Sequence, residues 1–282
     1  MNRPLADQGA AASKSDDNTL WLSATGFGRF SRCEVRWLRH HTDGRQDEPP
    51  TAPMLLGTLV HRLVGAWWKA GDWGPELAAA LAEWGASLPG RAGLDADDFE
   101  PPAYFRQATT IAQNYAAVYA GEREEWTDTW LEQAFEVPFY KGVGLRGYID
   151  AVHVNRDGET WLREIKTMKS WQRMKQVPFD PQLHLYMRAW QQLTGSTPAG
   201  IIFDAISTYE YKTKRCAQDS FRQVVVPYDA PQVSNVMGAY VAMAHRVEGL
   251  LAGAQPVKAL SDNCTWCPHY VGCAVPAAPA EG

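Results

Sequence analysis

Two runs of strand-forming residues joined by a short polar turn constrain the fold of this chain more than any other feature. Residues 144–154 and 160–167 are rich in β-branched and aromatic side chains, as β-strands usually are. The turn between them, 155–158, reads Asn-Arg-Asp-Gly, and three of these four residue types favour tight turns. The sequence therefore predicts a β-hairpin centred on this turn.

The length of the turn decides which residues of the two strands face each other. A three-residue loop that ends at Gly158, with this glycine in the left-handed conformation, centres the hairpin on residue 157. Asp150 and Glu164 then lie directly opposite each other, with their Cβ atoms about 4.5–5.5 Å apart. A two-residue turn instead places Asp150 opposite Ile165. The sequence permits the first register without requiring it.

The first register gathers groups that suit phosphodiester hydrolysis. Side chains alternate along a strand, so Glu164 and Lys166 point to the same face. The facing carboxylates of Asp150 and Glu164 repel each other unless a cation such as Mg²⁺ or Mn²⁺ lies between them. Lys166 would position or deprotonate the attacking water, or stabilise charge on the phosphate. The competing interpretation is an ordinary exposed hairpin with a cross-strand Lys–Glu pair, because an Asp and a Glu-x-Lys alone are a weak signal.

Three residues elsewhere in the chain are candidates for the same site. His61 lies among apolar residues of a predicted helix and is expected to face inward, where a neutral imidazole is a competent metal ligand. A core histidine without a ligand role is the commoner outcome for such a position. Gln182 and Tyr186 are four residues apart on another predicted helix and therefore share a face. They could hold a phosphate or a base, although this spacing alone says little.

The wider pattern predicts a helical first part and a strand-rich second part. Helices are predicted at 20–41, 55–70, 75–87, 103–120, 181–193 and 231–251, and strands at 131–140, 144–154, 160–167, 201–208 and 221–226. Pairs of strands, a helix and more strands behind a helical front indicate a mixed α/β sheet. The first 18 residues are small and polar and are expected to be disordered.

The cysteines indicate a second metal site. Three of the five cysteines lie within ten residues of one another: Cys264, Cys267 and Cys273. Such a cluster in a cytoplasmic chain favours a metal over disulfides. The fourth ligand of a four-coordinate site could come from Cys33, Cys216 or His269. A local zinc knuckle would use His269, whereas Cys33 would tie together the two ends of the chain. Thiolate ligands suit zinc or an iron–sulfur cluster, and the spacing does not decide between them.

The net charge of −5 disfavours a protein that coats nucleic acid nonspecifically. It leaves room for a local basic groove. Candidate basic stripes are Arg163, Lys166, Lys169, Arg173 and Lys175, and then Lys212, Lys214 and Arg215. No apolar run approaches the roughly 18–20 residues that span a bilayer, and the start of the chain lacks the hydrophobic segment of a signal peptide. A cytoplasmic protein without membrane association is expected.

In their order and spacing, these motifs resemble the RecB-like branch of the PD-(D/E)XK nuclease superfamily. The resemblance is strongest to its iron–sulfur members, which include CRISPR-associated exonucleases, their phage relatives and the nuclease domain of AddB. The matching motifs are His61, Gly147-Tyr148-Ile149-Asp150, Glu164-Ile165-Lys166, Gln182-Leu183-His184-Leu185-Tyr186, and Cys264-x₂-Cys267-x₅-Cys273 with the upstream Cys33. The resemblance extends from about Trp21 to Cys273, which is nearly the whole chain.

The resemblance implies a restriction-endonuclease-like α/β fold, with a mixed β-sheet core flanked by helices and a largely helical N-terminal part. It also implies a division into domains. A tail at 1–20 precedes a nuclease domain at 21–255, which has a helical part at 21–125 and a catalytic α/β core at 126–255. A cluster segment at 256–276, completed by Cys33, and a flexible tail at 277–282 follow.

The resemblance also implies roles for individual residues. The catalytic residues would be Asp150, Glu164 and Lys166. The ligands of Mg²⁺ or Mn²⁺ would be His61, Asp150, Glu164 and the carbonyl of Ile165. Gln182 and Tyr186 would lie beside the DNA. A [4Fe–4S] cluster would be held by Cys33, Cys264, Cys267 and Cys273, with zinc as the alternative. One departure is Glu34 after the first cysteine, where the family often has proline.

The activity expected from this resemblance is that of a metal-dependent DNA exonuclease. Its substrate would be single-stranded DNA ends, with 5′→3′ cleavage favoured, in DNA repair, recombination or phage DNA metabolism. Three alternatives stay open: a catalytically silent DNA-binding or scaffold subunit, a zinc-containing protein without iron, and an endonuclease with the same chemistry.

Overall fold

The computed structural model describes residues 19–42, 51–87, 101–208 and 217–259, together with Cys264, Cys267 and Cys273. The chain divides into two compact units. The first unit comprises Met1–Asp47, Phe135–Gly147 and Pro231–Gly282, and the second comprises Glu48–Ala134 and Tyr148–Ala230. The predicted disordered start, the tail at 277–282, the basic residues at 212–215, and the alternative ligands Cys216 and His269 lie outside the described residues.

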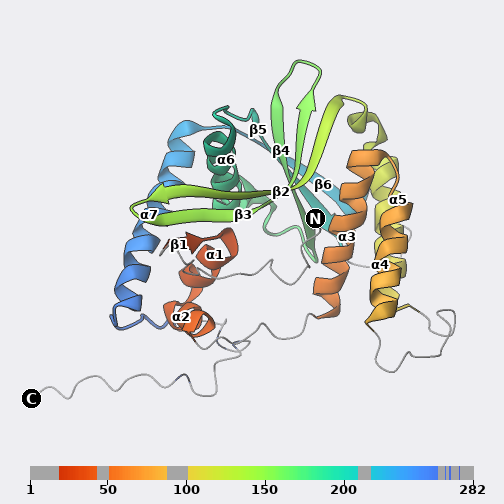
Figure 1. Cartoon of the computed structure of the whole chain (residues 1–282). Helices are drawn as coiled ribbons and strands as arrows, with labels where there is room; N and C mark the ends of the chain where they lie inside the picture. Colours follow the sequence, from red (N-terminus) through yellow and green to blue (C-terminus); the bar gives the residue numbers. More distant parts are fainter. Residues whose placement is uncertain are drawn as a thin grey trace, which may run out of the picture. The chain divides into compact units, whose positions relative to one another are not determined.

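The predicted mixed α/β sheet is confirmed (Figure 1). Its strands are β1 (Leu20–Leu22), β2 (Trp126–Tyr140), β3 (Val143–Asn155), β4 (Thr160–Met168), β5 (Gly200–Ser207) and β6 (Phe221–Pro227). They are ordered β1-β3-β4-β5-β6, and β2 pairs with β3. The β1–β3 and β4–β5 pairs are parallel, whereas the β3–β4 and β5–β6 pairs are antiparallel.

Four helices accompany the strands of the second unit: α3 (Ala52–Ala70), α4 (Gly74–Ala86), α5 (Ala103–Arg123) and α6 (Pro181–Thr194). The first three share one apolar core with Ile165 of β4 and Ile206 of β5. Helix α6 contacts β4 and β5, and its Gln182 reaches Glu164, which points away from that core. The two faces of β4 are therefore covered by different helices, because successive strand residues alternate between faces.

The first unit contains α1 (Ala24–Arg32), α2 (Glu34–Thr42) and nearly all of α7 (Ala230–Leu251). The ring of Phe27 on α1 stacks on that of Tyr240 on α7, with centroids 4.3 Å apart. Trp37 of α2 is fully buried. Strand β1 pairs with the start of β3, where Leu20 is opposite Val143.

The prediction of a single helix across residues 20–41 is wrong. The first residues form β1, and the helical stretch is divided into α1 and α2 at Cys33, whose backbone is extended with φ −170° and ψ 117°. An extended residue interrupts the repeating helical hydrogen bonds. Helix α1 begins after Ser23, whose hydroxyl accepts a hydrogen bond from the Gly26 amide at 3.1 Å.

The other predicted elements are present, with small shifts at their ends. Helix α3 begins at Ala52 rather than at residue 55, and β2 begins at Trp126 rather than at residue 131. Helix α6 ends at Thr194, one residue beyond the predicted end, and the next residue, Gly195, adopts the left-handed conformation (φ +73°) that ends helices. Within the described ranges, none of the helices has the length and apolar character needed to span a bilayer.

Candidate active site

The loop between β3 and β4 has the three-residue geometry that the sequence predicts. The amide of Gly158 donates to the carbonyl of Asn155 at 3.0 Å, and the amide of Asn155 donates to the carbonyl of Glu159 at 3.1 Å. Gly158 has a φ of +80°, which a residue with a side chain adopts only at a cost. Asn155 also accepts hydrogen bonds on its side-chain oxygen from the amides of Asp157 and Glu159. The turn is therefore held by local chemistry.

This loop sets the register of the two strands. Ala151 pairs with Arg163, and the pairing continues toward the turn without a break. The paired residues, 151–154 with 160–163, have the register predicted from the sequence. The pairing ends at Ala151, and Asp150 and Glu164 are the next residues in the same register. The carboxylate of Asp150 accepts a hydrogen bond from the amide of Ile165 at 2.8 Å, which holds the Asp150 side chain against β4.

Glu164 is a buried acid, with 1% of its surface exposed. Its Oε1 contacts Nζ of Lys166 and accepts a hydrogen bond from Nε2 of Gln182 at 2.9 Å. Within the described residues, its Oε2 has no hydrogen-bond partner. Burial, together with the negative charge of Asp150, raises the pKa of Glu164 to about 7.

Asp150 and His61 form the second contact of the site. Helix α3 approaches β4 closely at Gly57, where a Cβ atom would lie only 3.0 Å from Oγ1 of Thr167. His61 follows one turn later on the same helix face, and its Nδ1 is 3.4 Å from Oδ2 of Asp150. Burial raises the pKa of Asp150, but the positive charges of His61 and Lys166 outweigh it and lower that pKa overall.

Lys166 keeps its positive charge in this setting. Burial alone lowers the pKa of Lys166, but the charges of Glu164 and Asp150 raise it further than burial lowers it. A lysine that holds its proton is a poor base. Of the roles predicted for Lys166, charge stabilisation beside the phosphate therefore fits this environment better than removal of a proton from water.

Gln182 and Tyr186 share one face of α6, as their spacing predicts. Nε2 of Gln182 lies 2.6 Å from the hydroxyl of Tyr186 and also donates to Glu164. Asp180 caps the start of helix α6, and its carboxylate accepts a hydrogen bond from the backbone amide of Gln182 at 2.9 Å, a common arrangement at helix starts. The side-chain amide of Gln182 thus orients the carboxylate of Glu164. Reasoning from the sequence missed this contact.

The family of this chain follows from a comparison of its sequence with known protein families. A family model for the PD-(D/E)XK nuclease superfamily matches residues 21–274, which is most of the chain. The chain belongs to the PD-(D/E)XK nuclease superfamily. The acid–x–Lys sequence of β4 and the acid of β3 are among the motifs that carry the resemblance to this superfamily. The narrower assignment to the RecB-like branch stays a prediction.

One solved structure shares this fold. A candidate exonuclease from Eubacterium rectale superposes with a TM-score of 0.55 at 15% identity, covering 87% of this chain and 87% of that chain. An alkaline exonuclease from Laribacter hongkongensis, LHK-Exo, has a TM-score of 0.35 at 15% identity, covering 68% of this chain and 88% of that chain. No curated protein matches this sequence. At such identity the first likeness supports the fold alone.

The donor atoms of this PD-(D/E)XK nuclease suit a hard divalent cation. Asp150 and Glu164 supply carboxylate oxygens, and Oε2 of Glu164 is a buried oxygen without a hydrogen-bond partner among the described residues. In the part of the chain that the structure describes, no three His, Cys, Asp or Glu side chains are already arranged around one point for a metal ion. The oxygen and nitrogen donors of Asp150, Glu164 and His61 fit Mg²⁺ or Mn²⁺ chemically.

The four predicted cluster ligands of the nuclease are free cysteines with half-buried side chains: Cys33, Cys264, Cys267 and Cys273. The three consecutive residues 257–259 contact the parts of the chain in which these cysteines lie. The Val257 amide donates to Glu34 at 2.7 Å, next to Cys33. The Lys258 ammonium donates to the Cys273 carbonyl at 3.1 Å, and the Ala259 carbonyl lies 3.7 Å from Sγ of Cys264. The 257–259 tripeptide therefore connects the two ends of the chain.

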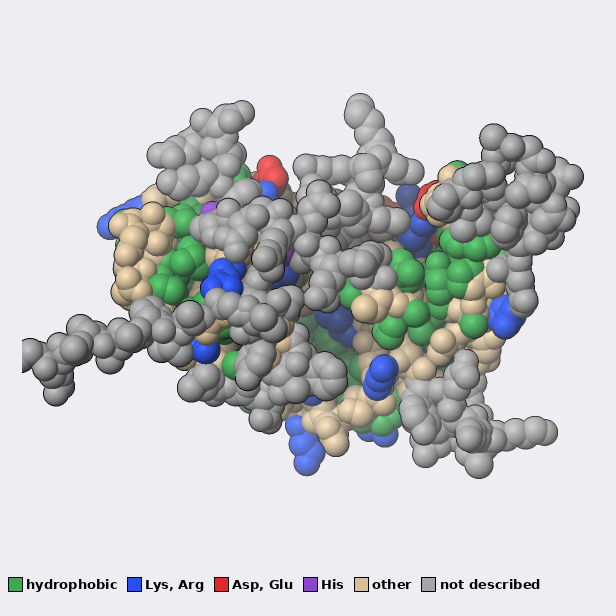
Figure 2. All heavy atoms as spheres, turned by 90° about the horizontal axis from the view of Figure 1, so that it is seen from below, with side chains coloured by type: hydrophobic (Ala, Val, Ile, Leu, Met, Phe, Trp, Pro, Cys, Tyr) green, Lys and Arg blue, Asp and Glu red, His purple; other side chains and the backbone are tan. Residues whose placement is uncertain are grey.

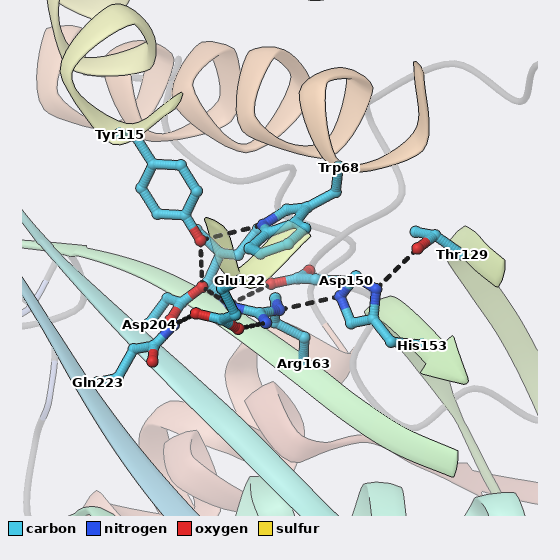
Figure 3. A network of polar contacts seen from close by, with 10 residues as sticks. Trp68, Tyr115, Glu122, Thr129, Asp150, His153, Arg163, Asp204 and Gln223 are labelled. Carbon is cyan, nitrogen blue, oxygen red and sulfur yellow. Dashed lines mark hydrogen bonds and ion pairs between the residues drawn. The ribbon is translucent and has the colours of Figure 1, made fainter. Parts of the chain in front are cut away.

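A buried polar network lies on the opposite face of β4 (Figure 3). Arg163 is fully buried and donates to Asp204 and to Glu122, each at 2.5 Å, and to Nε2 of His153 at 2.9 Å. Burial, followed by the charge of Arg163, lowers the pKa of His153 to about 2, so this imidazole is neutral and accepts the hydrogen bond. The other members are Trp68, Tyr115, Thr129 and Gln223. The prediction that Arg163 belongs to a basic surface stripe is wrong.

Proposed function

We propose that this protein is a metal-dependent DNA exonuclease that hydrolyses phosphodiester bonds at single-stranded DNA ends, with 5′→3′ cleavage favoured. The observation that carries the proposal is the gathering of Asp150, Glu164 and Lys166, because Asp150 accepts from the amide of Ile165 and Lys166 contacts Glu164. Membership of a nuclease superfamily supports it, and the exonuclease name of the Eubacterium rectale protein agrees with it.

The residues of the site divide the work of hydrolysis among them. Asp150 and Glu164 would hold the Mg²⁺ or Mn²⁺ ion, with His61 and the Ile165 carbonyl as further ligands. A bound divalent ion supplies Lewis acidity and a more acidic water. Gln182 keeps the Glu164 carboxylate in place through its 2.9 Å hydrogen bond. Lys166 presents a positive charge beside the scissile phosphate, where negative charge grows during attack by water.

The surface charge of the molecule is compatible with a DNA substrate. Although the chain carries a net charge of −5, Lys and Arg side chains are seen at several places among the coloured atoms of Figure 2, and Asp and Glu at few. A local excess of basic groups attracts a phosphate backbone even when the whole protein is acidic. A role in DNA repair, recombination or phage DNA metabolism, in the cytoplasm, accompanies the proposal as an expectation from the resemblance.

Incubation with end-labelled DNA tests the proposal. Linear single-stranded, linear duplex and closed circular DNA are each incubated with and without Mn²⁺. We expect Mn²⁺-dependent release of mononucleotides or short fragments from the linear single strand, and survival of the circle. Labels on the 5′ and 3′ ends in separate reactions report the polarity. Cleavage of the circle would favour the endonuclease alternative, and the absence of any cleavage would favour a silent DNA-binding subunit.

Metal binding is expected to weaken as the pH falls below about 7, because Glu164 must lose its proton before it can coordinate an ion. Each further pH unit below this pKa lowers the apparent Mn²⁺ affinity about tenfold. The folding stability of the metal-free protein depends on pH in the opposite sense. The pKa of Glu164 is higher in the folded than in the unfolded state, so its contribution to stability is present at low pH and is lost as the pH rises through about 7. Isothermal titration calorimetry across this range checks the first statement, and an affinity independent of pH contradicts it.

We further propose that Cys33, Cys264, Cys267 and Cys273 bind a [4Fe–4S] cluster, with zinc as the alternative, and that residues 256–276 form a cluster segment. The contacts of the 257–259 tripeptide support this proposal. Glu34, next to Cys33, supports it as well. The Glu34 carboxylate accepts hydrogen bonds from two nitrogens of Arg246, at 2.8 and 2.7 Å, and from the Val257 amide. A proline at this position could make none of these three hydrogen bonds.

The variant Glu34→Gln is expected to lower the metal affinity of the cysteine site about tenfold or more, as is common for residues that support metal ligands. The change removes the charged pairing with Arg246 and weakens the hold on Val257. Iron, sulfide and zinc are measured per chain after anaerobic purification, and hydrogen exchange at the Val257 amide is measured alongside. The matched control is Glu248→Gln on α7, where the acid pairs with the exposed His245 at 3.7 Å. Equal metal content in Glu34→Gln and wild type would contradict the role of Glu34.

A further inference from the structure

The linker between β4 and α6 carries exposed basic residues and one exposed aromatic ring. Lys169, Arg173 and Lys175 are exposed. Phe179, the last residue of the 3₁₀ helix η3 (Met174–Phe179), is 68% exposed. No other large apolar side chain in the described part of the chain is as exposed. A single exposed apolar ring is common on protein surfaces, and what distinguishes Phe179 is that its linker also carries three exposed basic residues.

The backbone that carries Phe179 is held in place on both sides. Val177 is buried, and its carbonyl accepts from the Asp180 amide at 3.0 Å. The carbonyl of Pro178 lies 2.9 Å from Nε2 of the buried His184. The ring of Phe179 is therefore presented to solvent from an anchored segment.

The position of this ring places it near the proposed catalytic centre. Gln182, whose amide donates to Glu164 at 2.9 Å, follows Phe179 by three residues. Their Cα atoms are therefore at most about 11 Å apart. A nucleotide whose phosphate lies beside Lys166, which contacts Glu164, has its base no farther than this from that phosphate. The ring is thus within reach of a base at the cleavage point.

The second aromatic residue of the linker is already engaged. The guanidinium of Arg222 lies over the ring of Trp171, 4.8 Å from its centroid, and Trp171 is only partly exposed. Because that cation covers one face of the indole, Phe179 is the better candidate for contact with a base.

We propose that Phe179 stacks on an unpaired base at the DNA end while Lys169, Arg173 and Lys175 contact the adjacent phosphates. This inference rests on the proposed nuclease function and specifies its substrate. A base in a duplex already has both faces covered by its neighbours, whereas an unpaired base offers a free face. The contact therefore selects single-stranded ends, and it is tolerant of sequence because every base has a flat aromatic face.

Fluorescence anisotropy without metal ions tests the inference, because binding is then measured without cleavage. Phe179→Ala is expected to weaken binding of a labelled single-stranded oligonucleotide about 5- to 100-fold, the usual effect of losing one stacked base. Phe179→Trp is expected to restore it. An oligonucleotide whose terminal nucleotides lack bases should bind the wild type as weakly as the normal oligonucleotide binds Phe179→Ala. That oligonucleotide should lose nothing more with the variant.

The controls separate stacking from general damage and from charge. Leu193→Ala removes another exposed apolar side chain, from α6, and is expected to leave binding unchanged. Replacing Lys169, Arg173 and Lys175 with Gln is expected to reduce the salt dependence of binding, by about 0.7 in the log–log slope for each phosphate that the protein no longer neutralises. A duplex should bind Phe179→Ala as it binds the wild type.

Three results would overturn the inference: unchanged binding by Phe179→Ala, an equal loss on single strand and duplex, or a loss that adds to that from removing the bases. A protein that docks on the exposed ring in place of DNA would give the first result. The failure of the nuclease proposal has a different signature, in which single strands bind through Phe179 but wild-type protein with Mn²⁺ does not cleave them.

Discussion

Replacing Asp150, Glu164 or Lys166 with alanine is expected to lower the rate of DNA cleavage about 10²- to 10⁴-fold, the range of a single group that stabilises charge or moves a proton. Asp150 accepts from the amide of Ile165, and Lys166 contacts Glu164. Loss of either carboxylate removes half of the anionic pair that attracts the ion. Loss of the lysine removes the positive charge beside the phosphate. Single-turnover cleavage of end-labelled single-stranded DNA with saturating Mn²⁺ measures the effect.

The folded state provides the internal control for these variants. At pH values above 7, Glu164→Gln is expected to stabilise the metal-free protein against unfolding. The substitution removes a buried carboxyl group whose pKa is raised to about 7 and which is charged above that pH. A variant that is more stable and yet inactive has lost chemistry rather than structure. Asp157→Asn, in the exposed turn of the same hairpin, is expected to keep wild-type activity. Full residual activity in any of the three alanine variants would defeat the proposed mechanism.

The register of this site could be predicted from the sequence because local chemistry determines it. Gly158 accepts a positive φ of +80° at no steric cost, and the side chain of Asn155 closes the turn within four residues. Strand alternation then places Glu164 and Lys166 on one face. No information from distant parts of the chain enters these steps.

The contacts of Glu164 with other elements could be predicted only in part. Helical spacing placed Gln182 and Tyr186 on one face of α6, but it does not say which face meets β4. That depends on the path of the chain through η3 and on the Asp180 cap at the start of α6. The hydrogen bond from Gln182 to Glu164 is therefore a product of tertiary structure. The roles of these residues in DNA binding remain predictions.

Arg163 shows where reasoning from the sequence failed. A charged residue beside other basic residues is usually exposed, and alternation only says that Arg163 faces away from Glu164. Its partners Glu122 and Asp204 are each 41 residues away along the chain, on α5 and β5. The burial of an arginine with two distant acids has no local signature. The short strand β1 escaped prediction for a similar reason, because its pairing partner at Val143 is remote in sequence.

Replacing Arg163 with methionine is expected to destabilise the second unit by about 3–5 kcal/mol, the usual cost of removing one partner of a buried ion pair. Asp204 is 1% exposed and would lose its only cationic partner in the described network. Methionine keeps much of the volume beside the Trp68 ring, which lies 4.0 Å from the Arg163 guanidinium carbon. Urea unfolding of the metal-free protein, followed by tryptophan fluorescence, measures the loss.

The matched comparison is Arg62→Met, which also separates an arginine from two carboxylates, those of Glu76 and Glu83. These acids are 34% and 58% exposed, so water replaces the lost cation and the expected cost is about 1 kcal/mol or less. Asp204→Asn added to Arg163→Met should recover part of the larger loss, because the uncompensated charge is then gone. If the two arginine variants lose the same free energy of unfolding, burial of the acid does not determine the loss. Recovery by Asp204→Asn would assign the penalty to the stranded carboxylate on β5, the strand that pairs with β4 at Ile165.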